Sequence, residues 1–467
     1  MRTITLFALA LCLTVSPVRG AEQPNILFLL SDDQAWAGLS CPMHPDMPDS
    51  KHAFVETPNL AHLAEQGMRF SAAYAPAPVC SPTRISLQTG RNPAVLRWTK
   101  ASPPEFGHRL IEGESRKDLR DDEVTVADLL RAAGYATAHY GKWHLNGGGP
   151  EAHGYDESDG NTGNNDAAPH GPPNPVDIFG MGSRAADFMK RSHAAGKPFF
   201  IQMSYHALHY PENATPALIE KYRQLAPGGN DKEIGRAAMA EDLDRGVGEL
   251  LAKLDELGLS ESTYVIYMSD NGGSNRRTLM GGKGDLWEGG IRVPLIVRGP
   301  GVAPHSWCHQ RVVGYDWFPT FCHWAGVKQP LPSNLDGGDL SPLLAGSTDP
   351  VKRVREELVF HFPHYQGDTP HSAILLGDHK LIEFYETGGQ KLFDLSKDIG
   401  EQNNLAQAEP ELANALASRL HAYLKEANAA MPTANPDYDP AKEPAMNRGG
   451  GKEKKRQKSI MKVGEGF

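Results

Sequence analysis

The sequence predicts an α/β fold: a large, mixed and mostly parallel sheet sandwiched by helices, followed by a small C-terminal antiparallel-sheet sub-domain. Two patterns support this prediction. Continuous apolar runs alternate with amphipathic helical stretches through most of the chain, which is typical of parallel strands joined by helices. After about Ala345, short strands separated by glycines follow one another, which indicates a small antiparallel sheet. With 467 residues, 40% of them hydrophobic, the chain has room for one large domain, or for one large and one small.

The alternating elements can be placed in chain order. Pro24–Leu30 (PNILFLL) is apolar without interruption, as expected of a strand buried on both faces. Further strands are expected at Ala136–Tyr140, Lys197–Ser204 and Thr263–Met268. Helices are expected at Thr57–Gly67, Glu123–Ala133, Ile178–Ala194 and Ala237–Leu257.

The C-terminal sub-domain has its own pattern. We expect its strands at Leu358–His361, Ser372–Leu376, His379–Tyr385 and Lys391–Leu395, and a helix at Glu409–Glu426. The domain boundaries that follow are 21–345 for the large domain, 346–430 for the sub-domain, and 431–467 for a disordered basic tail. The tail is assigned from Lys452–Lys462, which is rich in basic residues and lacks apolar periodicity.

Residues 1–20 are predicted to be a signal peptide. Arg2 supplies a positive charge, Ile4–Val15 is a short apolar run, and Val18–Gly20 offers a cleavage site before Ala21. The run is too short to span a membrane, and no later segment reaches that length. We therefore expect an exported protein, periplasmic or extracellular, without a membrane span. The net charge of −10 argues against a nucleic-acid partner.

Export makes disulfides possible. Removal of the signal peptide leaves Cys41, Cys80, Cys308 and Cys322, enough for two bridges, or for one if Cys80 has a chemical role. Cys308 with Cys322 is the favoured pair.

The stretch Cys80–Arg84 (CSPTR) carries a cysteine and an arginine at the predicted start of a helix over Ile85–Gly90. Pro82 suits the first helical position, and Ser81 suits the N-cap. Cys80 would then lie at the positive end of the helix dipole, with Arg84 one turn further on, which favours an anion. Taken alone, a buried structural cysteine is the commoner explanation.

Two polar pairs each follow a predicted strand: Asp32-Asp33 and Asp270-Asn271. The carboxyl ends of parallel strands meet at one edge of the sheet, so the pairs can converge. Carboxylate and amide oxygens are the ligands that Ca²⁺ and Mg²⁺ prefer. Either pair alone would more often be a turn or a helix cap, but together they predict a metal site.

These segments and several others resemble, in order, the motifs of the type I sulfatases of the alkaline phosphatase superfamily. The resemblance extends from Pro24 to about Ala406. It rests on PNILFLLSDD, CSPTRISLQTG, GYATAHYGKWHL, HALHYP, SDNGG, GGKGDLWEGGIRVPLIVRGPG and KLFDLSKDIGEQNNLA. It implies a sulfuric ester hydrolase whose catalytic domain is the large domain.

The resemblance also implies the chemistry of the site. Cys80 would be oxidised to formylglycine, whose hydrate is the nucleophile and can release sulfate where a thiol could not. One Ca²⁺ ion per chain, with Mg²⁺ as the alternative, would be held by the two polar pairs and residue 80. Arg84, Lys142 and Lys283 would stabilise charge on the sulfuryl oxygens. His209, assisted by Lys283, would protonate the leaving oxygen, and His144 would be the base. His206 would contact the substrate or only pack.

The expected partners are a sulfated small molecule or glycan and a formylglycine-generating maturation enzyme. In the segment HFPHYQGDTPH, which also contains His371, either His361 or His364 is expected to contact the sugar, with a surface loop as the alternative. Two other functions remain open: a phosphonate monoester or phosphodiester hydrolase of the same superfamily, and an inactive glycan-binding homologue.

Overall fold

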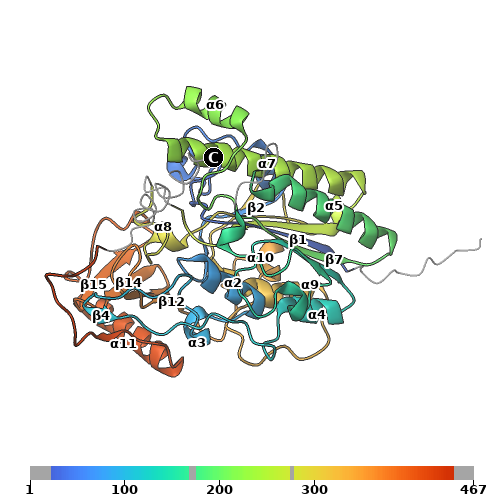
Figure 1. Ribbon diagram of the computed structural model, residues 1–467. Coiled ribbons are helices and arrows are strands. Elements are labelled where there is room, and N and C mark those ends of the chain that lie inside the picture. Colours follow the sequence, from blue (N-terminus) through green and yellow to red (C-terminus); the bar gives the residue numbers. More distant parts are fainter. Residues whose placement is uncertain (1–22, 168–174, 274–277, 446–467) are drawn as a thin grey trace, which may run out of the picture.

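The computed structural model describes residues 23–167, 175–273 and 278–445. A large central sheet lies between two layers of helices, and a smaller sheet lies at one side (Figure 1). Across the large sheet the strands are β10 (Ser306–Cys308), β2 (Met68–Phe70), β9 (Leu295–Arg298), β8 (Thr263–Ser269), β1 (Asn25–Ser31), β7 (Phe199–Ser204), β5 (Ala136–Gly141) and β6 (Glu157–Ser158). From β8 to β6 all neighbours are parallel, whereas β9 is antiparallel to β8 and to β2. The predicted mixed, mostly parallel sheet is therefore confirmed.

The central strand β1 is buried on both faces, as its uninterrupted apolar sequence predicts. Leu27 and Leu29 pack into one core, and Ile26, Phe28 and Leu30 pack into the other. The first core is covered by α1 (Pro58–Glu65), α5 (Ile178–Ala194), α6 (Pro216–Leu225) and α7 (Asp231–Glu256). The second is covered by α2 (Cys80–Thr89), α4 (Val126–Ala132) and α9 (Trp317–Trp324), on the opposite side in Figure 1.

The predicted starts of α7 and α4 are wrong, and in both cases the cap explains the difference. The α7 helix begins six residues before the predicted Ala237, because the Asn230 side chain accepts a hydrogen bond from the Glu233 N–H at 3.0 Å. The α4 helix begins after the predicted Glu123, because Thr125 and Asp128 form a capping box.

The small sheet is antiparallel throughout, as predicted. Its strands are β12 (Leu358–Phe362), β13 (His371–Leu376), β14 (His379–Phe384) and β15 (Gly389–Asp394). One face packs against α11 (Pro410–Glu426) through residues such as Ile374 and Leu420. The other face shares a core with Tyr74, Leu286 and Ile291 of the large domain. The small sheet is therefore joined to the large domain by an apolar core.

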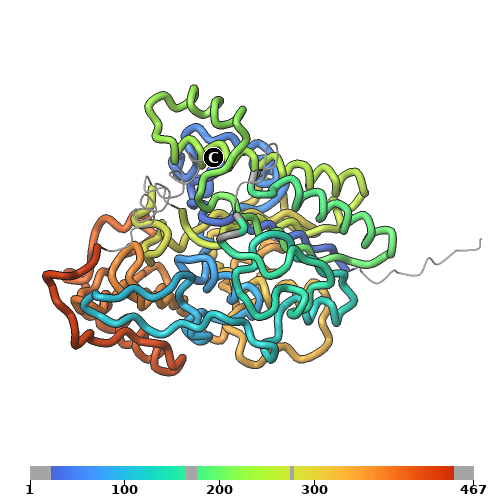
Figure 2. The backbone as a smooth tube through the Cα atoms, viewed as in Figure 1, coloured from blue at the N-terminus to red at the C-terminus, as the bar shows by residue number. Residues whose placement is uncertain are grey.

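The segment after α11 is partly ordered. Strand β16 (Thr433–Ala434) pairs with β4 (Leu110–Ile111), and Figure 2 shows this segment running along the side of the small sheet. The Asn435 amide also donates to the carbonyl of His108 at 2.8 Å. The prediction that the chain is disordered from residue 431 onward is therefore wrong for the residues around β16. The basic stretch Lys452–Lys462 and the predicted signal peptide lie outside the described residues.

The remaining elements are short. They are β3 (Ala73–Tyr74) paired with β11 (Val312–Val313), the helices α3 (Pro93–Leu96), α8 (Glu288–Ile291) and α10 (Ser341–Leu344), and the 3₁₀ turns η1 (Pro48–Ser50), η2 (Pro150–His153), η3 (Asn164–Ala167), η4 (Pro175–Asp177), η5 (Ser260–Ser262) and η6 (Gly314–Asp316).

The predicted disulfide is wrong. Cys41, Cys80, Cys308 and Cys322 are all buried free thiols. Cys308 lies in β10 and Cys322 in α9, where both pack as small apolar residues in the same core.

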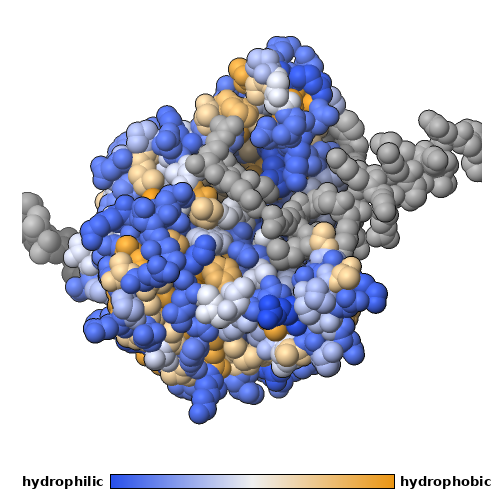
Figure 3. All heavy atoms as spheres, turned by 90° about the vertical axis from the view of Figure 1, so that its left-hand side faces the viewer, coloured by the Kyte–Doolittle hydropathy of each residue, from blue (hydrophilic) through white to orange (hydrophobic). Residues whose placement is uncertain are grey.

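The face in Figure 3 is mainly hydrophilic, with apolar side chains interspersed. Single exposed apolar residues such as Phe106 and Val354 are common on such surfaces. Within the described ranges, no helix combines the length and apolar composition that crossing a membrane requires.

Candidate active site

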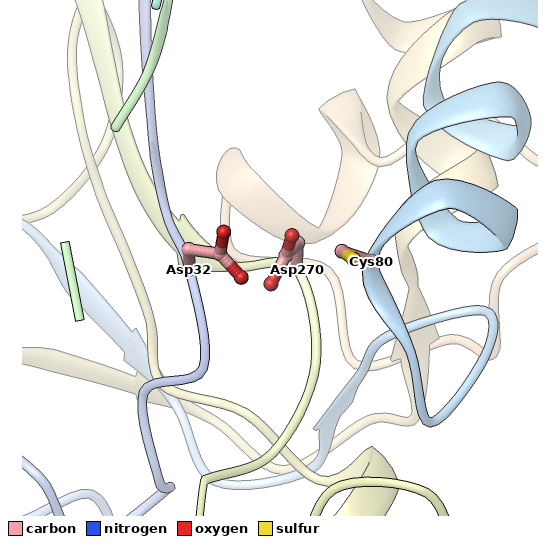
Figure 4. Close-up of side chains that lie close together, drawn as sticks. All are labelled: Asp32, Cys80 and Asp270. Atoms are coloured by element: carbon pink, nitrogen blue, oxygen red, sulfur yellow. The ribbon is translucent and has the colours of Figure 1, made fainter. Parts of the chain in front are cut away.

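The site is built where two central strands end. Ser31 of β1 pairs with Ser269 of β8, so Asp32 and Asp270, the next residue of each strand, lie side by side. Figure 4 shows both carboxylates and the Cys80 side chain, at the start of α2, pointing toward one another. A ligand atom from each of the three residues lies within 4.8 Å of the others. The structure thus brings the first polar pair, the second pair and the CSPTR segment together.

The second member of each pair faces its counterpart. The Asn271 amide donates to Asp33 Oδ1 at 2.8 Å, and the Asp33 backbone N–H donates to Asp270 Oδ1 at 3.3 Å. Asp33 has a positive φ of 61°, a conformation that only Gly, Asn and Asp adopt readily. This turn directs its carboxylate toward Lys283, whose Nζ lies 2.7 Å from Asp33 Oδ1.

The donor set fits a hard divalent cation. Asp32 Oδ1 and Asn271 Oδ1 are buried and have no hydrogen-bond partner among the described residues. Leaving such oxygens unpaired costs free energy that a bound ligand would recover. Burial and the neighbouring Asp32 raise the pKa of Asp270 to about 8. Crowded carboxylates of this kind favour a cation between them, and oxygen ligands suit Ca²⁺ or Mg²⁺.

The beginning of α2 differs from the prediction. The helix begins at Cys80, two residues before the predicted Pro82, and Val79 occupies the N-cap without a side-chain hydrogen bond. Ser81 does not cap the helix, because its hydroxyl donates to the His144 carbonyl and accepts from the Trp98 indole, each at 2.9 Å. The helix ends at Thr89, and Gly90 follows as its C-cap with a φ of 67°, where a glycine is favoured. Cys80 still lies in the first turn, at the positive end of the helix dipole.

Arg84 is buried and fixes Asp270. Its Nε and Nη2 lie 3.0 and 2.7 Å from Asp270 Oδ2, and its Nη1 donates to the backbone carbonyl of Lys142. These contacts connect α2 to the ends of β8 and β5. Charge-assisted bonds between groups excluded from water hold this geometry firmly.

Lys142 and His144 follow the end of β5. Lys142 Nζ pairs with Asp32 Oδ2, and this contact holds the pKa of Asp32 well below its usual range although burial alone would raise it. His144 Nδ1 lies 3.3 Å from Cys80 Sγ. Burial and the positive charge of Lys142 lower the pKa of His144 to about 2, so its imidazole is neutral.

Thr162 supports this segment and has no sequence signal that would have found it. Its carbonyl accepts from the His144 N–H at 2.8 Å, and its hydroxyl accepts from the Trp143 N–H at 3.0 Å. Only the fold, which returns the chain to β5 after β6, reveals that Thr162 holds His144 in place.

His206 and His209 reach the site from the segment after β7. His209 Nδ1 donates to the carbonyl of Tyr210 at 2.7 Å, which leaves Nε2 as the nitrogen available to a ligand. Burial and the charge of Lys283 lower the pKa of His209 to about 4. His206 Nδ1 is buried and has no partner within the described part of the chain. The sequence left the role of His206 undecided.

The C-terminal histidines do not fit the expected sugar contact. His361 and His364 are almost completely buried, so the alternative prediction, that they lie in a surface loop, is wrong as well. His361 accepts from the Ser372 hydroxyl at 2.6 Å and donates to the carbonyl of Ala430 at 3.2 Å. His364 accepts from the Thr99 hydroxyl at 2.8 Å and donates to Glu112 at 3.3 Å. With both nitrogens of each ring engaged, neither histidine has one left for a sugar.

Comparison with known proteins agrees with this geometry. The family model described as Sulfatase matches residues 24–327, and the one described as N-sulphoglucosamine sulphohydrolase, C-terminal, matches residues 282–430. Human arylsulfatase A is 31% identical, with 85% of this chain and 87% of that protein covered. N-acetylgalactosamine-6-sulfatase from Canis lupus familiaris is 31% identical, covering 77% of this chain and 72% of that protein.

Solved structures share the fold. The structure of Ps i-CgsB in complex with k-i-k-neocarrahexaose has a TM-score of 0.73 at 24% identity, covering 89% of this chain and 95% of that one. A structure in complex with its substrate D-glucosamine-2-N,6-O-disulfate has a TM-score of 0.65 at 20% identity, covering 87% and 98%. Motifs, fold and relatives agree, and the chain belongs to the type I sulfatase family, whose members are sulfuric ester hydrolases.

Proposed function

We propose that this sulfatase hydrolyses sulfate esters of a carbohydrate, with formylglycine formed from Cys80 as its nucleophile and one divalent cation, Ca²⁺ or else Mg²⁺, as its cofactor. The observation that carries the proposal is the buried meeting of Asp32, Asp270 and Cys80 beside two unpaired acceptor oxygens. Hydrolysis of a sulfate ester needs a nucleophile, an electrophilic anchor for sulfate and an acid for the leaving oxygen. In this proposal, the site would supply a residue for each of these roles.

The cation would be held by Asp32, Asp33, Asp270 and Asn271 together with residue 80. When bound, it would polarise a sulfate oxygen and favour ionisation of the nucleophile. Formylglycine would be introduced at Cys80 by a maturation enzyme. Its hydrate would supply a hydroxyl that can later expel sulfate.

His144 is suited to accept a proton from residue 80. In the structure the Cys80 sulfur stands in for a hydroxyl oxygen of the hydrate, and His144 Nδ1 is 3.3 Å away. Because the imidazole is neutral, its lone pair is available. Ser81 and Thr162 hold the backbone on either side of this ring, so its approach to residue 80 is fixed.

His209 is suited to protonate the departing oxygen through Nε2, with Lys283 assisting. An incoming sulfate is an anion, and an anion nearby raises the pKa of a histidine. The protonated form would therefore be favoured only when substrate is bound. Lys142 and Lys283, which pair with Asp32 and Asp33 in the structure, would stabilise negative charge on the sulfuryl oxygens. Arg84 was expected to do the same, but its guanidinium is engaged with Asp270 and with the carbonyl of Lys142, so we propose that it orients Asp270 for the cation instead.

A carbohydrate substrate is supported by the relatives. One is named N-acetylgalactosamine-6-sulfatase, and two structures of the same fold contain neocarrahexaose and D-glucosamine-2-N,6-O-disulfate. Export to the periplasm or the extracellular space, inferred from residues 1–20, would place the enzyme where sulfated glycans are met.

The test is sulfate release from a panel of sulfated mono- and oligosaccharides by protein co-expressed with a maturation enzyme. 4-Nitrophenyl sulfate and a 4-nitrophenyl phosphonate are compared in parallel. We expect sulfate release from at least one saccharide and preference for the sulfate over the phosphonate. Faster turnover of the phosphonate would favour a phosphonate or phosphodiester hydrolase, and glycan binding without sulfate release would favour an inactive homologue.

A further inference from the structure

The segment that carries Lys283 is held from two sides. The N–H of Gly284 donates to the carbonyl of Pro78, two residues before Cys80, at 2.9 Å. The N–H of Leu286 donates to His371 Nε2 of the small sheet at 2.8 Å. Lys283, which reaches Asp33, thus has the nucleophile's segment on one side and the C-terminal sheet on the other.

The hydrogen bonds of His371 determine its tautomer. Its Nδ1 lies 2.6 Å from the carbonyl of Thr369, which can only accept, so Nδ1 carries the proton. The N–H of Leu286 can only donate, so Nε2 carries the lone pair. Both bonds form together only with a neutral imidazole. The ring is fully buried and stacks on Phe384, with ring centroids 5.5 Å apart, and burial lowers its pKa to about 4.

The chain just before His371 packs directly on the Lys283 segment. A side chain at Gly284 would lie 2.7 Å from the Gln366 side chain, and one at Gly367 would lie 2.8 Å from the carbonyl oxygen of Gly284. These close contacts leave no room for a side chain at Gly284 or at Gly367. The position of the Lys283 segment therefore depends on the small sheet.

We propose that His371 is a positioning residue that acts through Leu286 to hold Lys283 at the site. The inference rests on the proposed function, because it takes Lys283 to act on the sulfate. His371 itself lies in β13 and bonds to Leu286, three residues after Lys283. Loss of its acceptor nitrogen would let the backbone at Leu286 shift, and small misplacements of a group that acts on the transition state cost rate.

The experiment compares three substitutions of His371 with a matched control. In His371→Gln the side-chain amide can place an acceptor near the position of Nε2. In His371→Asn the amide reaches only the position of Nδ1, so the Leu286 N–H loses its partner while polarity is kept. His371→Leu removes both bonds. The control is His361→Leu, because His361 belongs to the same sheet and is equally engaged, but with Ser372 and Ala430.

We expect His371→Asn and His371→Leu to lower kcat for sulfate release about 10- to 100-fold with little change in KM. His371→Gln should recover kcat to within a few-fold of wild type, and His361→Leu should keep it. Hydrogen exchange followed by mass spectrometry should show faster exchange in the peptide containing Leu286 in the Asn and Leu variants of His371, and no such change in His361→Leu.

Wild-type kcat and unchanged exchange in His371→Asn would overturn the proposal, as would equal losses of kcat in His371→Leu and His361→Leu. If His371→Leu does not fold, the comparison of His371→Asn with His371→Gln still tests the proposal. If the matured wild type released no sulfate, the proposed function would fail. The exchange measurement would then still show whether His371 holds the Lys283 segment.

Discussion

Two groups of buried histidines differ in what their ring nitrogens meet. The centre histidines are those that interact with the charge of Asp32: His144, His206 and His209. The sheet histidines are those of the C-terminal segment: His361, His364 and His371. Both nitrogens of every sheet histidine are hydrogen-bonded to protein. In the centre, His206 Nδ1 has no partner among the described residues, and His144 Nδ1 faces the thiol of Cys80.

This difference separates a ligand site from a scaffold. A buried polar atom without a partner costs free energy. In the described part of the chain, single unpaired nitrogens also occur on other buried histidines, His108 and His139, so it is the gathering of several unpaired atoms at one place that indicates a ligand site. The unpaired oxygens of Asp32 and Asn271 lie in the centre, whereas the sheet histidines are satisfied internally. Sequence alone could not make this distinction, because histidine occurs next to aromatic residues and proline in both segments.

The largest effect is expected from Cys80→Ala. Matured wild type should release sulfate, and the variant should be slower by about 10³-fold or more, because no nucleophile remains. Its thermal unfolding should change little, because the role of Cys80 is chemical. Cys322→Ala, which alters a buried cysteine away from the centre, should retain activity but lose stability by about 1–2 kcal/mol. Substantial activity in Cys80→Ala would contradict the assignment.

The second largest effect is expected from removing the cation that the unpaired oxygens of Asp32 and Asn271 would bind. Chelation should abolish most activity of the wild type, and added Ca²⁺ at about 100 times its Kd should raise the free energy of unfolding by about 2.7 kcal/mol. Asn271→Leu should lose this Ca²⁺-dependent stabilisation, which thermal unfolding with and without Ca²⁺ measures. His361→Leu should keep it. If neither Ca²⁺ nor Mg²⁺ stabilised the wild type, the centre would not be a cation site.

The sheet histidines should make the fold acid-sensitive. Burial lowers the pKa of His361 to about 3, below the value of about 6.5 expected in the unfolded chain. The unfolded state then binds more protons between these values, so the contribution of His361 to stability is complete above pH 6.5 and declines as pH falls. Between pH 6.5 and pH 4 we expect a loss of about 3 kcal/mol from this group.

Urea unfolding of wild type and His361→Gln across that range measures the contribution. The difference in unfolding free energy between the two proteins should shrink as pH falls, because only the wild type has the group that must be buried uncharged. A constant difference would mean that His361 is not held neutral by the fold.

The smallest kinetic effect is expected from His364→Ala. Because its ring is engaged with Thr99 and Glu112, KM for the best saccharide of the panel should change less than about twofold. Stability should fall by about 1–3 kcal/mol, because Glu112 and Thr99 lose a buried partner. Steady-state kinetics on the purified variant provides the measurement. A several-fold rise in KM would instead support the contact between His364 and the sugar that the sequence predicted.

The sequence predicted the elements whose signal is local. Strand β1 begins and ends one residue after its predicted bounds, and α5 begins and ends where predicted. Both were predictable because a continuous apolar run and a helical periodicity are properties of the segment itself. The beginnings of α4 and α7 were placed wrongly although their caps, Thr125 and Asn230, are local, so the cap residues were the weaker signal. The beginning of α1 was predicted to within one residue, although Asp244 of α7, which accepts the N–H groups of Asn59 and Leu60, comes from another helix. No pattern within α1 indicates that partner.

The same distinction applies to the site. Asp32 and Asp270 could be paired from the sequence, because parallel strands end at a common edge. The predicted N-cap role of Ser81 is wrong because its hydroxyl donates to the carbonyl of His144, which lies 63 residues away in the sequence. Thr162 and His371 act through backbone groups of other segments, and such contacts exist only in the folded chain.

The central claim is that the buried cluster around residue 80 is a sulfatase centre built on a modified cysteine. Mass spectrometry of the peptide containing Cys80, from protein made in its native host, tests it most directly. We predict loss of the sulfur atom and gain of an oxygen atom at Cys80, with Cys41, Cys308 and Cys322 unchanged. An intact thiol at Cys80 in active protein would contradict the account.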